Sequence, residues 1–368
     1  MTAFTNVIRH GLPVALLALG MALSLPGYAD PSQNSKGKGN GSGNSYVQHN
    51  LVSDQVGVAA HTDPNLVNAW GLDALDTSPW WVANNGTGTS TIYGADGATR
   101  RPPVNVPGKP TGLVANSTAS FQLAPGDAAF FLFATEEGKI FGWNPSVAPN
   151  DAVEAVANTT GAIYKGLAIA STASGDFLYA TDFHNGRVDV FDGSFAPAGL
   201  PASAFTDPSL PSGYAPFGIQ NVGGEIVVTF AQQDEAAEDE VAGHGKGFVD
   251  AFDTSGNLLA RIAQHGQLNA PWGIAQAPAS GFGRFSANLL IGNFGDGEIT
   301  AFVQERDGTW EPNGQLRTGG GKVLSIDGLW ALQFGHGSAA NNGPSTTLFF
   351  TAGPNDESHG LFGTVTAG

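Results

Sequence analysis

The sequence predicts an all-β protein, a six-bladed β-propeller of four-stranded antiparallel blades whose N-terminal strand completes the last blade and closes the ring. A glycine flanked by apolar residues recurs six times, at spacings of 41 to 55 residues. This period is typical of propeller blades. The six copies are Ala69–Leu72, Pro110–Leu113, Tyr164–Leu167, Pro216–Ile219, Pro271–Ile274 and Ile326–Leu329.

Each copy is followed by further strand signals. A second apolar run begins within about 25 residues of every glycine, and a third run with alternating apolar and polar residues follows a polar loop, as in Arg187–Phe191. Alternation with a period of two is typical of half-buried strands. Turn pairs such as Asp192-Gly193 then lead into a short fourth run, as in Leu258–Ile262. The second runs are Trp80–Ala83, Phe130–Ala134, Phe177–Thr181, Ile226–Phe230, Leu289–Gly292 and Leu348–Thr351.

The two ends of the repeat region complement each other. The sixth copy ends at Leu361–Val365 after three strands, and the segment Tyr46–Val52 is a strand without a copy of its own. An unpaired sheet edge would invite aggregation. We therefore predict that Tyr46–Val52 pairs with the third strand of the last blade and closes the ring.

The N-terminal segment has the features of an export signal. Arg9 and His10 precede an apolar run over Leu12–Leu25, and Gly27 and Ala29 are the small residues that a signal peptidase reads. The run is shorter than the roughly 20 residues that span a bilayer, and no later stretch is apolar enough to do so. We expect a signal peptide over 1–29, a flexible Gly/Ser/Asn linker over 30–45, and one propeller domain over 46–368. The expected location is secreted or periplasmic.

Composition narrows the range of partners. The formal net charge is −17, so the surface repels nucleic acid and anionic membranes. The chain has no cysteine, and both of its methionines, Met1 and Met21, lie in the expected signal. We expect a monomer that binds a small polar ligand or an extracellular protein.

At several of these motifs the sequence resembles the NHL-repeat group of six-bladed propellers, and more narrowly an uncharacterised family of secreted bacterial propellers. The resemblance covers about Tyr46 to Val365 and implies the fold and an address outside the cytoplasm. Better-known relatives include sugar-lactone hydrolases, strictosidine-synthase-like proteins and peptide-amidating lyases, but the chain carries no complete catalytic signature of any of them. The resemblance rests on Pro216–Ile219, Pro271–Ile274, Ala180–Gly186 and Phe248–Asp253.

The loops between second and third strands are the expected ligand site, because in a propeller they gather at one mouth of the channel. Their carboxylate and amide oxygens suit Ca²⁺, which takes about 6 to 8 such ligands. Turns also require Asn, Asp and Gly, so plain turn chemistry is the alternative. The predicted calcium ligands are Asp182, Asn185, Asn293, Asp296 and Asp356, and the predicted ligand-binding residues are Asn84, Glu136, His184, Gln232 and His359.

Three further features carry weaker hypotheses. The acidic insertion at 234–240 has the charge of a calcium loop without its ligand spacing, and a solvated lid is the preferred interpretation. The loop histidines 184, 244, 336 and 359 could converge on Zn²⁺, but none shows ligand-pair spacing. Trp70, Trp272 and Trp330 recur beside repeat glycines, where packing between blades is favoured over lining the channel.

Two functions remain open from the sequence. The first is a non-enzymatic binding or scaffold propeller, stabilised by calcium, that holds its ligand at the channel mouth. The alternative is a metal-dependent hydrolase of lactones or esters, or a lyase, in which Asp182, Asn293 and Asp356 hold the ion. A shifted pKa beside an open metal position would distinguish the two.

Overall fold

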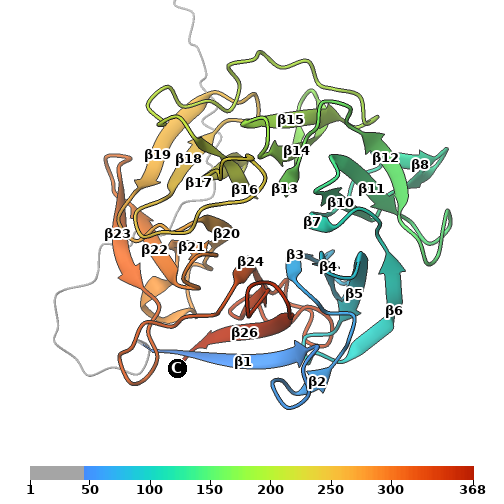
Figure 1. The fold of residues 1–368 in the computed structure, drawn as a ribbon. Helices are drawn as coiled ribbons and strands as arrows, with labels where there is room; N and C mark the ends of the chain where they lie inside the picture. Colours follow the sequence, from blue (N-terminus) through green and yellow to red (C-terminus); the bar gives the residue numbers. More distant parts are fainter. Residues whose placement is uncertain (1–44) are drawn as a thin grey trace, which may run out of the picture. The chain divides into compact units, whose positions relative to one another are not determined.

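A computed structural model describes residues 45–368, and the predicted signal and nearly all of the predicted linker lie outside these residues. The described chain forms six blades around a central axis (Figure 1). Apart from one 3₁₀ turn, η1 (Gly283–Phe285), its regular elements are all strands. The prediction of an all-β, six-bladed propeller is confirmed.

The blades follow one another in sequence order, each an antiparallel meander from the channel outward. Blade 1 contains β3 (Ala69–Asp73), β4 (Trp80–Asn84), β5 (Thr89–Tyr93) and β6 (Thr99–Asn105). Blade 2 contains β7 (Pro110–Ala115), β10 (Phe131–Thr135), β11 (Lys139–Trp143) and β12 (Val153–Ala157), with a small hairpin of β8 (Gln122–Ala124) and β9 (Asp127–Ala128). Blade 3 contains β13 (Tyr164–Thr172), β14 (Gly175–Asp182) and β15 (Arg187–Asp192).

The second half of the ring repeats the pattern. Blade 4 contains β16 (Tyr214–Val222), β17 (Glu225–Gln232), β18 (Phe248–Phe252) and β19 (Leu258–Gln264). Blade 5 contains β20 (Pro271–Gln276), β21 (Leu289–Asn293), β22 (Ile299–Gln304) and β23 (Trp310–Gln315). Blade 6 contains β24 (Leu329–Phe334), β25 (Leu348–Ala352), β26 (Leu361–Ala367) and β1 (Tyr46–Ser53), beside which lies the short β2 (His61–Thr62).

The N-terminal strand closes the ring as predicted. β1 runs antiparallel to β26 from Tyr46, opposite Ala367, to Ser53, opposite Leu361, with one bulge. In Figure 1 the blue and red ends of the chain lie side by side in this last blade. Ring closure therefore joins the two ends of the described chain by a ladder of backbone hydrogen bonds.

Blade 3 departs from the predicted four strands. Its outer strand β15 is followed by a loop that makes only one bridge, Phe191 to Pro197, and a hydrogen bond from Ala198 N to Val190 O (2.8 Å). Pro197 and Pro201 cannot donate backbone hydrogen bonds, so this segment cannot form a regular ladder. The turn residues Asp192 and Gly193, which predicted a fourth strand after β15, did not indicate that this strand is missing.

The repeat glycines lie where neighbouring inner strands approach most closely. A Cβ placed on Gly218 would overlap the carbonyl oxygen of Trp272 in the next blade, and one on Gly71 would meet the backbone of β7. Side-chain hydroxyls join the same neighbours, as where Thr229 donates to Pro271 O at 2.6 Å. The glycines are therefore required by packing between blades.

The predicted sixth copy is out of register by three residues. Gly328 is a turn residue with a φ of 65° before β24, whereas Ala331 occupies the position of the other repeat glycines. The amide of Ala331 contacts the Thr351 hydroxyl (3.1 Å), as that of Gly218 contacts Thr229. The spacing between copies varies by more than three residues, so it could not distinguish Gly328 from Ala331 as the repeat position.

Candidate functional site

The position before each repeat glycine contributes one residue per blade around the axis. Four of these residues are aromatic and pack into one buried cluster, and the other two are Thr111 and Lys165. The six positions are equivalent in the strand register, and five of them hold an uncharged residue. The charged side chain of Lys165 therefore indicates a special role. The aromatic members are Trp70, Phe217, Trp272 and Trp330.

Indole rings fill the centre of the channel. The rings of Trp70 and Trp330 stack with centroids 3.5 Å apart, and Trp272 meets both edge-on. Phe294 stacks on the other side of Trp330 at 4.1 Å. These three tryptophans therefore pack against one another at the axis. The sequence had favoured packing between blades over a position in the channel. They separate the channel into two mouths.

The first mouth contains a buried lysine between carboxylates. Lys165 Nζ lies 2.7 Å from Glu136 Oε1 and 3.2 Å from Asp239 Oδ1, and the Lys165 side chain is 1 % exposed. It also lies 5.1 Å from the centre of the Trp70 ring, within cation–π range. Burial opposes its charge, but Glu136 and the other nearby carboxylates outweigh burial and raise the pKa of Lys165. Lys165 is therefore a fixed cation.

Glu136 is the fixed anion of the pair. Burial works against its ionisation, yet Lys165 and the amide of Asn85, which donates to Glu136 Oε2 at 3.2 Å, lower its pKa. Lys109 adds a second, exposed cation at 3.8 Å. Of the ion pairs at this mouth, the one between Lys165 and Glu136 has the strongest electrostatic attraction, because it is the best shielded from water.

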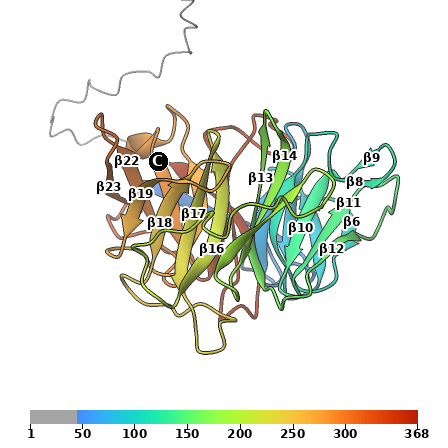
Figure 2. The ribbon, with the colours of Figure 1, turned by 90° about the horizontal axis from the view of Figure 1, so that it is seen from above.

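The insertion between β17 and β18 folds as a hairpin at this mouth. Val241 N donates to Gln232 O (2.8 Å) and Asp234 N donates to Asp239 O (2.9 Å). We call residues 232–241 the acidic hairpin. Figure 2 shows the connection that contains it projecting from the lower face of the disc. The insertion is thus an ordered hairpin that delivers Asp239 to Lys165.

Two more carboxylates complete the mouth. Burial, reinforced by Glu357 and Asp239 and opposed by Lys165, raises the pKa of Glu240 to about 8. Burial also raises the pKa of Glu357, against the effects of an Asn68 hydrogen bond and of Lys165. We call Glu136, Asp239, Glu240 and Glu357 together the acidic mouth. Its four carboxyl groups share one buried cation, and at neutral pH Glu240 keeps a proton that a bound cation would displace.

The loop that carries Glu357 is held in an unusual backbone conformation. Asn355, Asp356 and Glu357 all have positive φ, at 57°, 51° and 62°. Non-glycine residues in this region each cost about 1 to 3 kcal/mol, and such conformations cluster at functional sites. The rest of the fold must stabilise this loop.

The predicted ligand-binding residues divide into two groups. Glu136 belongs to the acidic mouth, and Gln232 forms the base of the acidic hairpin. His184 contacts Ala237 O at the turn of the hairpin (3.2 Å), whereas His359 Nδ1 contacts Asp54 Oδ2 (2.7 Å). The fifth residue, Asn84, is fully buried and donates to two threonine hydroxyls of β5.

The predicted calcium ligands pair within their own blades. Asp182 is fully buried and contacts Asn185 Nδ2 (2.7 Å) and an Arg187 guanidinium nitrogen (3.3 Å). Asn293 donates to Asp296 Oδ1 (3.1 Å), and Asp356 is exposed. Within residues 45–368, no group of three or more His, Asp or Glu is arranged to hold a metal ion. The calcium site stays a prediction.

Sequence reasoning missed Lys165, Asn68 and the role of Glu240. A signal for Lys165 was present, because aligning the copies on their glycines places lysine where three others have Trp or Phe. Asn68 accepts a hydrogen bond from Trp330 Nε1 (3.2 Å), and no repeat pattern marks it. Glu240 depends on how the acidic hairpin folds, which its sequence does not specify.

The fold and this site define the class of the protein, a six-bladed propeller with an aromatic channel plug and an acidic mouth. No family model matches the sequence. The chain is 33% identical over 330 residues to Uncharacterized protein R648 of Acanthamoeba polyphaga mimivirus, covering 86% of this chain and 78% of that protein. The chain belongs to the same family as that protein.

Solved structures show the same fold at low identity. The soluble aldose sugar dehydrogenase of Escherichia coli matches with a TM-score of 0.54 and 14% identity, over 88% of this chain and 100% of that chain. A streptogramin B lyase matches with a TM-score of 0.51 and 11% identity, over 89% and 100%. Propellers host many unrelated functions, so these similarities establish architecture alone. In the described part of the chain, no helix could cross a membrane.

Proposed function

We propose that this propeller is a binding protein whose acidic mouth holds a small polar ligand through a cationic group on that ligand. The observation that carries the proposal is the imbalance around Lys165: Glu136, Asp239, Glu240 and Glu357 converge there against one buried ammonium. A bound cation would relieve this repulsion, and ion-pair contacts would be strengthened by partial exclusion of water.

A second observation supports a ligand with an additional hydrogen-bond acceptor. The indole nitrogen of Trp70, whose ring lies beside Lys165 Nζ, is buried and has no hydrogen-bond partner. Buried donors without partners are costly and uncommon. An acceptor on the ligand could satisfy this N–H group while the cationic group contacts the carboxylates.

The exposed ion pair gives the ligand a route into the mouth. The Asp239 side chain is 72 % exposed, so its contact with Lys165 is screened by water and contributes little. Displacing the acidic hairpin would therefore cost less than breaking the buried pair of Lys165 and Glu136. The hairpin is the element we expect to move.

Thermal denaturation with putrescine tests the proposal, with sodium chloride at matched ionic strength as control; calcium chloride, added separately, tests the turn-loop site predicted from the sequence. A ligand at a hundredfold excess over its Kd stabilises the folded state by about 2.7 kcal/mol, which corresponds to several degrees. The Asp239→Asn/Glu240→Gln variant should lose most of the shift. The Asp182→Asn/Asp296→Asn variant should keep it.

The opposite result would be equally clear. A calcium shift that survives in the hairpin variant and disappears in the Asp182→Asn/Asp296→Asn variant would place the ion in the turn loops predicted from the sequence. Superimposable melting curves with and without both cations would refute a cation site at either place.

A second candidate is a hydrolase of lactones or esters, or a lyase, at the same mouth. The observation that favours it is a raised pKa of about 8 for Glu240, which makes this residue a proton donor at neutral pH beside the fixed Lys165 cation. A panel of lactones and esters tests this candidate. Turnover that persists in both Lys165→Met and Glu240→Gln would exclude the acidic mouth as its source.

A further inference from the structure

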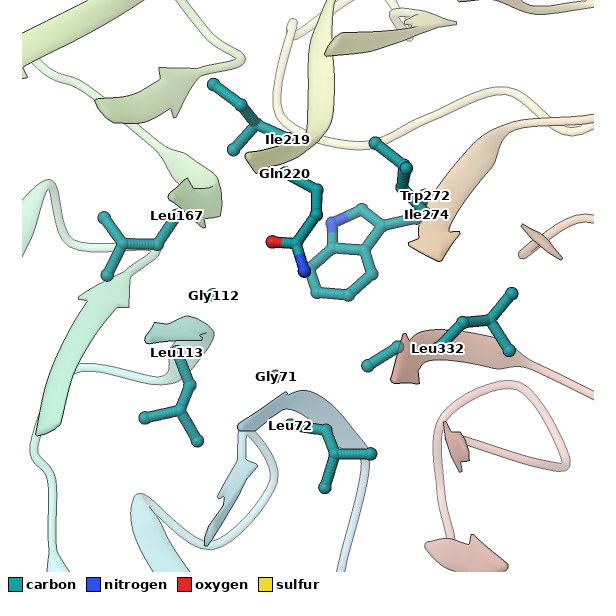
Figure 3. A pocket seen from close by; sticks show the side chains of 11 residues that line it. Gly71, Leu72, Gly112, Leu113, Leu167, Ile219, Gln220, Trp272, Ile274 and Leu332 are labelled. Atoms are coloured by element: carbon teal, nitrogen blue, oxygen red, sulfur yellow. The ribbon is translucent and has the colours of Figure 1, made fainter. Parts of the chain in front are cut away.

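The opposite mouth of the channel has a different chemistry. One aliphatic residue from each blade, directly after the repeat glycine position, surrounds the axis on this side of the tryptophan plug. Figure 3 shows Gln220 and the indole of Trp272 reaching over the opening between these six residues. We call it the apolar mouth; its ring is Leu72, Leu113, Leu167, Ile219, Ile274 and Leu332.

A groove opens beside this ring and shares Gln220 with it. The groove has a volume of about 270 Å³ and runs between blades 4, 5 and 6. Gln220, Gln276 and Gln333 line it together with Phe334 and His336. Of the residues that line the groove and the ring, all within 45–368, none is Asp, Glu, Lys or Arg, although the chain carries a net charge of −17.

The orientation of one groove amide is fixed from below. Asp73 accepts hydrogen bonds from two backbone amides, those of Ala74 and Ala115, and from Gln333 Nε2 (3.2 Å). Because Gln333 Nε2 is committed to Asp73, its Oε1 must point away, where it meets Gln220 Nε2 at a long 3.4 Å. A hydroxyl group placed between these amides could make shorter hydrogen bonds with both.

An unsatisfied donor lies in the cavity of the apolar mouth, which shares Gln220 with the groove. Trp272 is 8 % exposed, its indole nitrogen has no hydrogen-bond partner, and its side chain lines the cavity of the apolar mouth. The ring itself has about 40 Å³ of free space, enough for a single small group. The body of a ligand must therefore lie in the groove, with one oxygen directed toward Trp272.

We propose that the groove at the apolar mouth binds a neutral polyhydroxylated ligand of the size of one monosaccharide. Amide side chains both donate and accept, which suits hydroxyl groups, and the Phe334 ring offers an apolar face. A cationic ligand would lose hydration and meet no carboxylate in the lining, and an anionic one would meet only the imidazole of His336. The volume is just below the roughly 300 Å³ at which sites for drug-sized ligands begin, which fits one sugar ring.

This site is independent of the acidic mouth, because the stacked tryptophans lie between the two. Saturation-transfer NMR with a panel of neutral monosaccharides and myo-inositol tests it, using the intact chain. We expect transfer from the protein to at least one neutral member. Glucuronate and glucosamine, which carry a negative and a positive charge, should bind at least tenfold more weakly than glucose.

Substitutions locate the site. Gln333→Leu should weaken binding about tenfold, which is the loss expected for one to two neutral hydrogen bonds. Gln276→Leu, at an exposed position, should weaken ligand binding without affecting folding. This variant replaces Gln333→Leu in the test if Gln333→Leu does not fold. Gln304→Leu on β22, which replaces another exposed glutamine away from the groove, is the control that should bind like the unmodified chain.

Three outcomes would overturn the proposal. The first is the absence of transfer to every neutral compound. The second is binding of glucosamine that exceeds binding of glucose and weakens with salt, which would indicate electrostatic recognition. The third is unchanged binding in both groove variants, or loss of binding in Gln304→Leu, which would place the ligand elsewhere.

Discussion

Removing the Tyr46 side chain should loosen the strand that closes the ring. Tyr46 is 1 % exposed, and its ring packs against Phe282 (5.0 Å) and Phe285 (5.7 Å) of blade 5. Its hydroxyl donates to Phe282 O (3.1 Å) and accepts from Phe285 N (3.3 Å). The first residue of β1 is therefore anchored to the neighbouring blade as well as to β26.

The magnitude follows from these contacts. Truncating a buried aromatic residue to alanine costs about 3 to 5 kcal/mol, so Tyr46→Ala should lower the free energy of unfolding by that amount. Tyr46→Phe leaves the two backbone partners unsatisfied and should cost about 1 to 3 kcal/mol. At roughly 2 °C for each kcal/mol in a domain of this size, Tyr46→Ala should melt about 6 to 10 °C lower.

Urea denaturation followed by tryptophan fluorescence measures both variants. Val47→Ala is the matched control, because the adjacent side chain on the same strand is 42 % exposed and should change stability by less than about 0.5 kcal/mol. If Tyr46→Ala and Val47→Ala unfold at the same urea concentration, β1 does not stabilise the ring, and the role assigned to closure is wrong.

Three further predictions concern the channel. Lys165→Met leaves the largely shielded Glu136 carboxylate without its cation and should cost about 3 to 5 kcal/mol at pH 7; the cost should shrink at pH 4, because without Lys165 nothing comparable holds the pKa of Glu136 low, and an equal loss at both pH values would contradict the ion-pair account. Glu240 has a folded pKa raised from 4.5 to about 8, so its protonation stabilises the folded state fully below pH 4.5 and this contribution is lost as the pH rises through 8. Melting temperatures of Glu240→Gln should therefore rise relative to the unmodified chain across this window, and a constant difference would refute the shift. Gly218→Ala, whose Cβ would overlap the Trp272 carbonyl, should cost about 1 to 3 kcal/mol in chemical denaturation, whereas Gly319→Ala, with no neighbour within 4 Å, should be close to neutral; similar losses would remove the packing argument.

The sequence by itself was enough to predict the number of blades and the closure of the ring. The recurrence of glycine at blade spacing, the alternation within strands and the surplus strand at Tyr46–Val52 predicted six blades and their closure, because each reports a local property of strands and turns. Blade 3 and the sixth copy were the exceptions. Pro197 breaks a ladder that spacing implied, and Ala331 replaces a glycine on which the pattern depended.

The tertiary structure alone decided which polar residues meet. Lys165 and Glu136 are 29 residues apart and belong to different blades, and Asp239 reaches them from an insertion whose hairpin shape no repeat specifies. The raised pKa of Glu240 arises from burial and from the carboxylates that this convergence brings close to it. The uncharged groove at the other mouth likewise depends on Asp73 fixing the Gln333 amide across the joint between blades 1 and 6. Long-range side-chain placement of this kind depends on packing in three dimensions, which local periodicity does not encode.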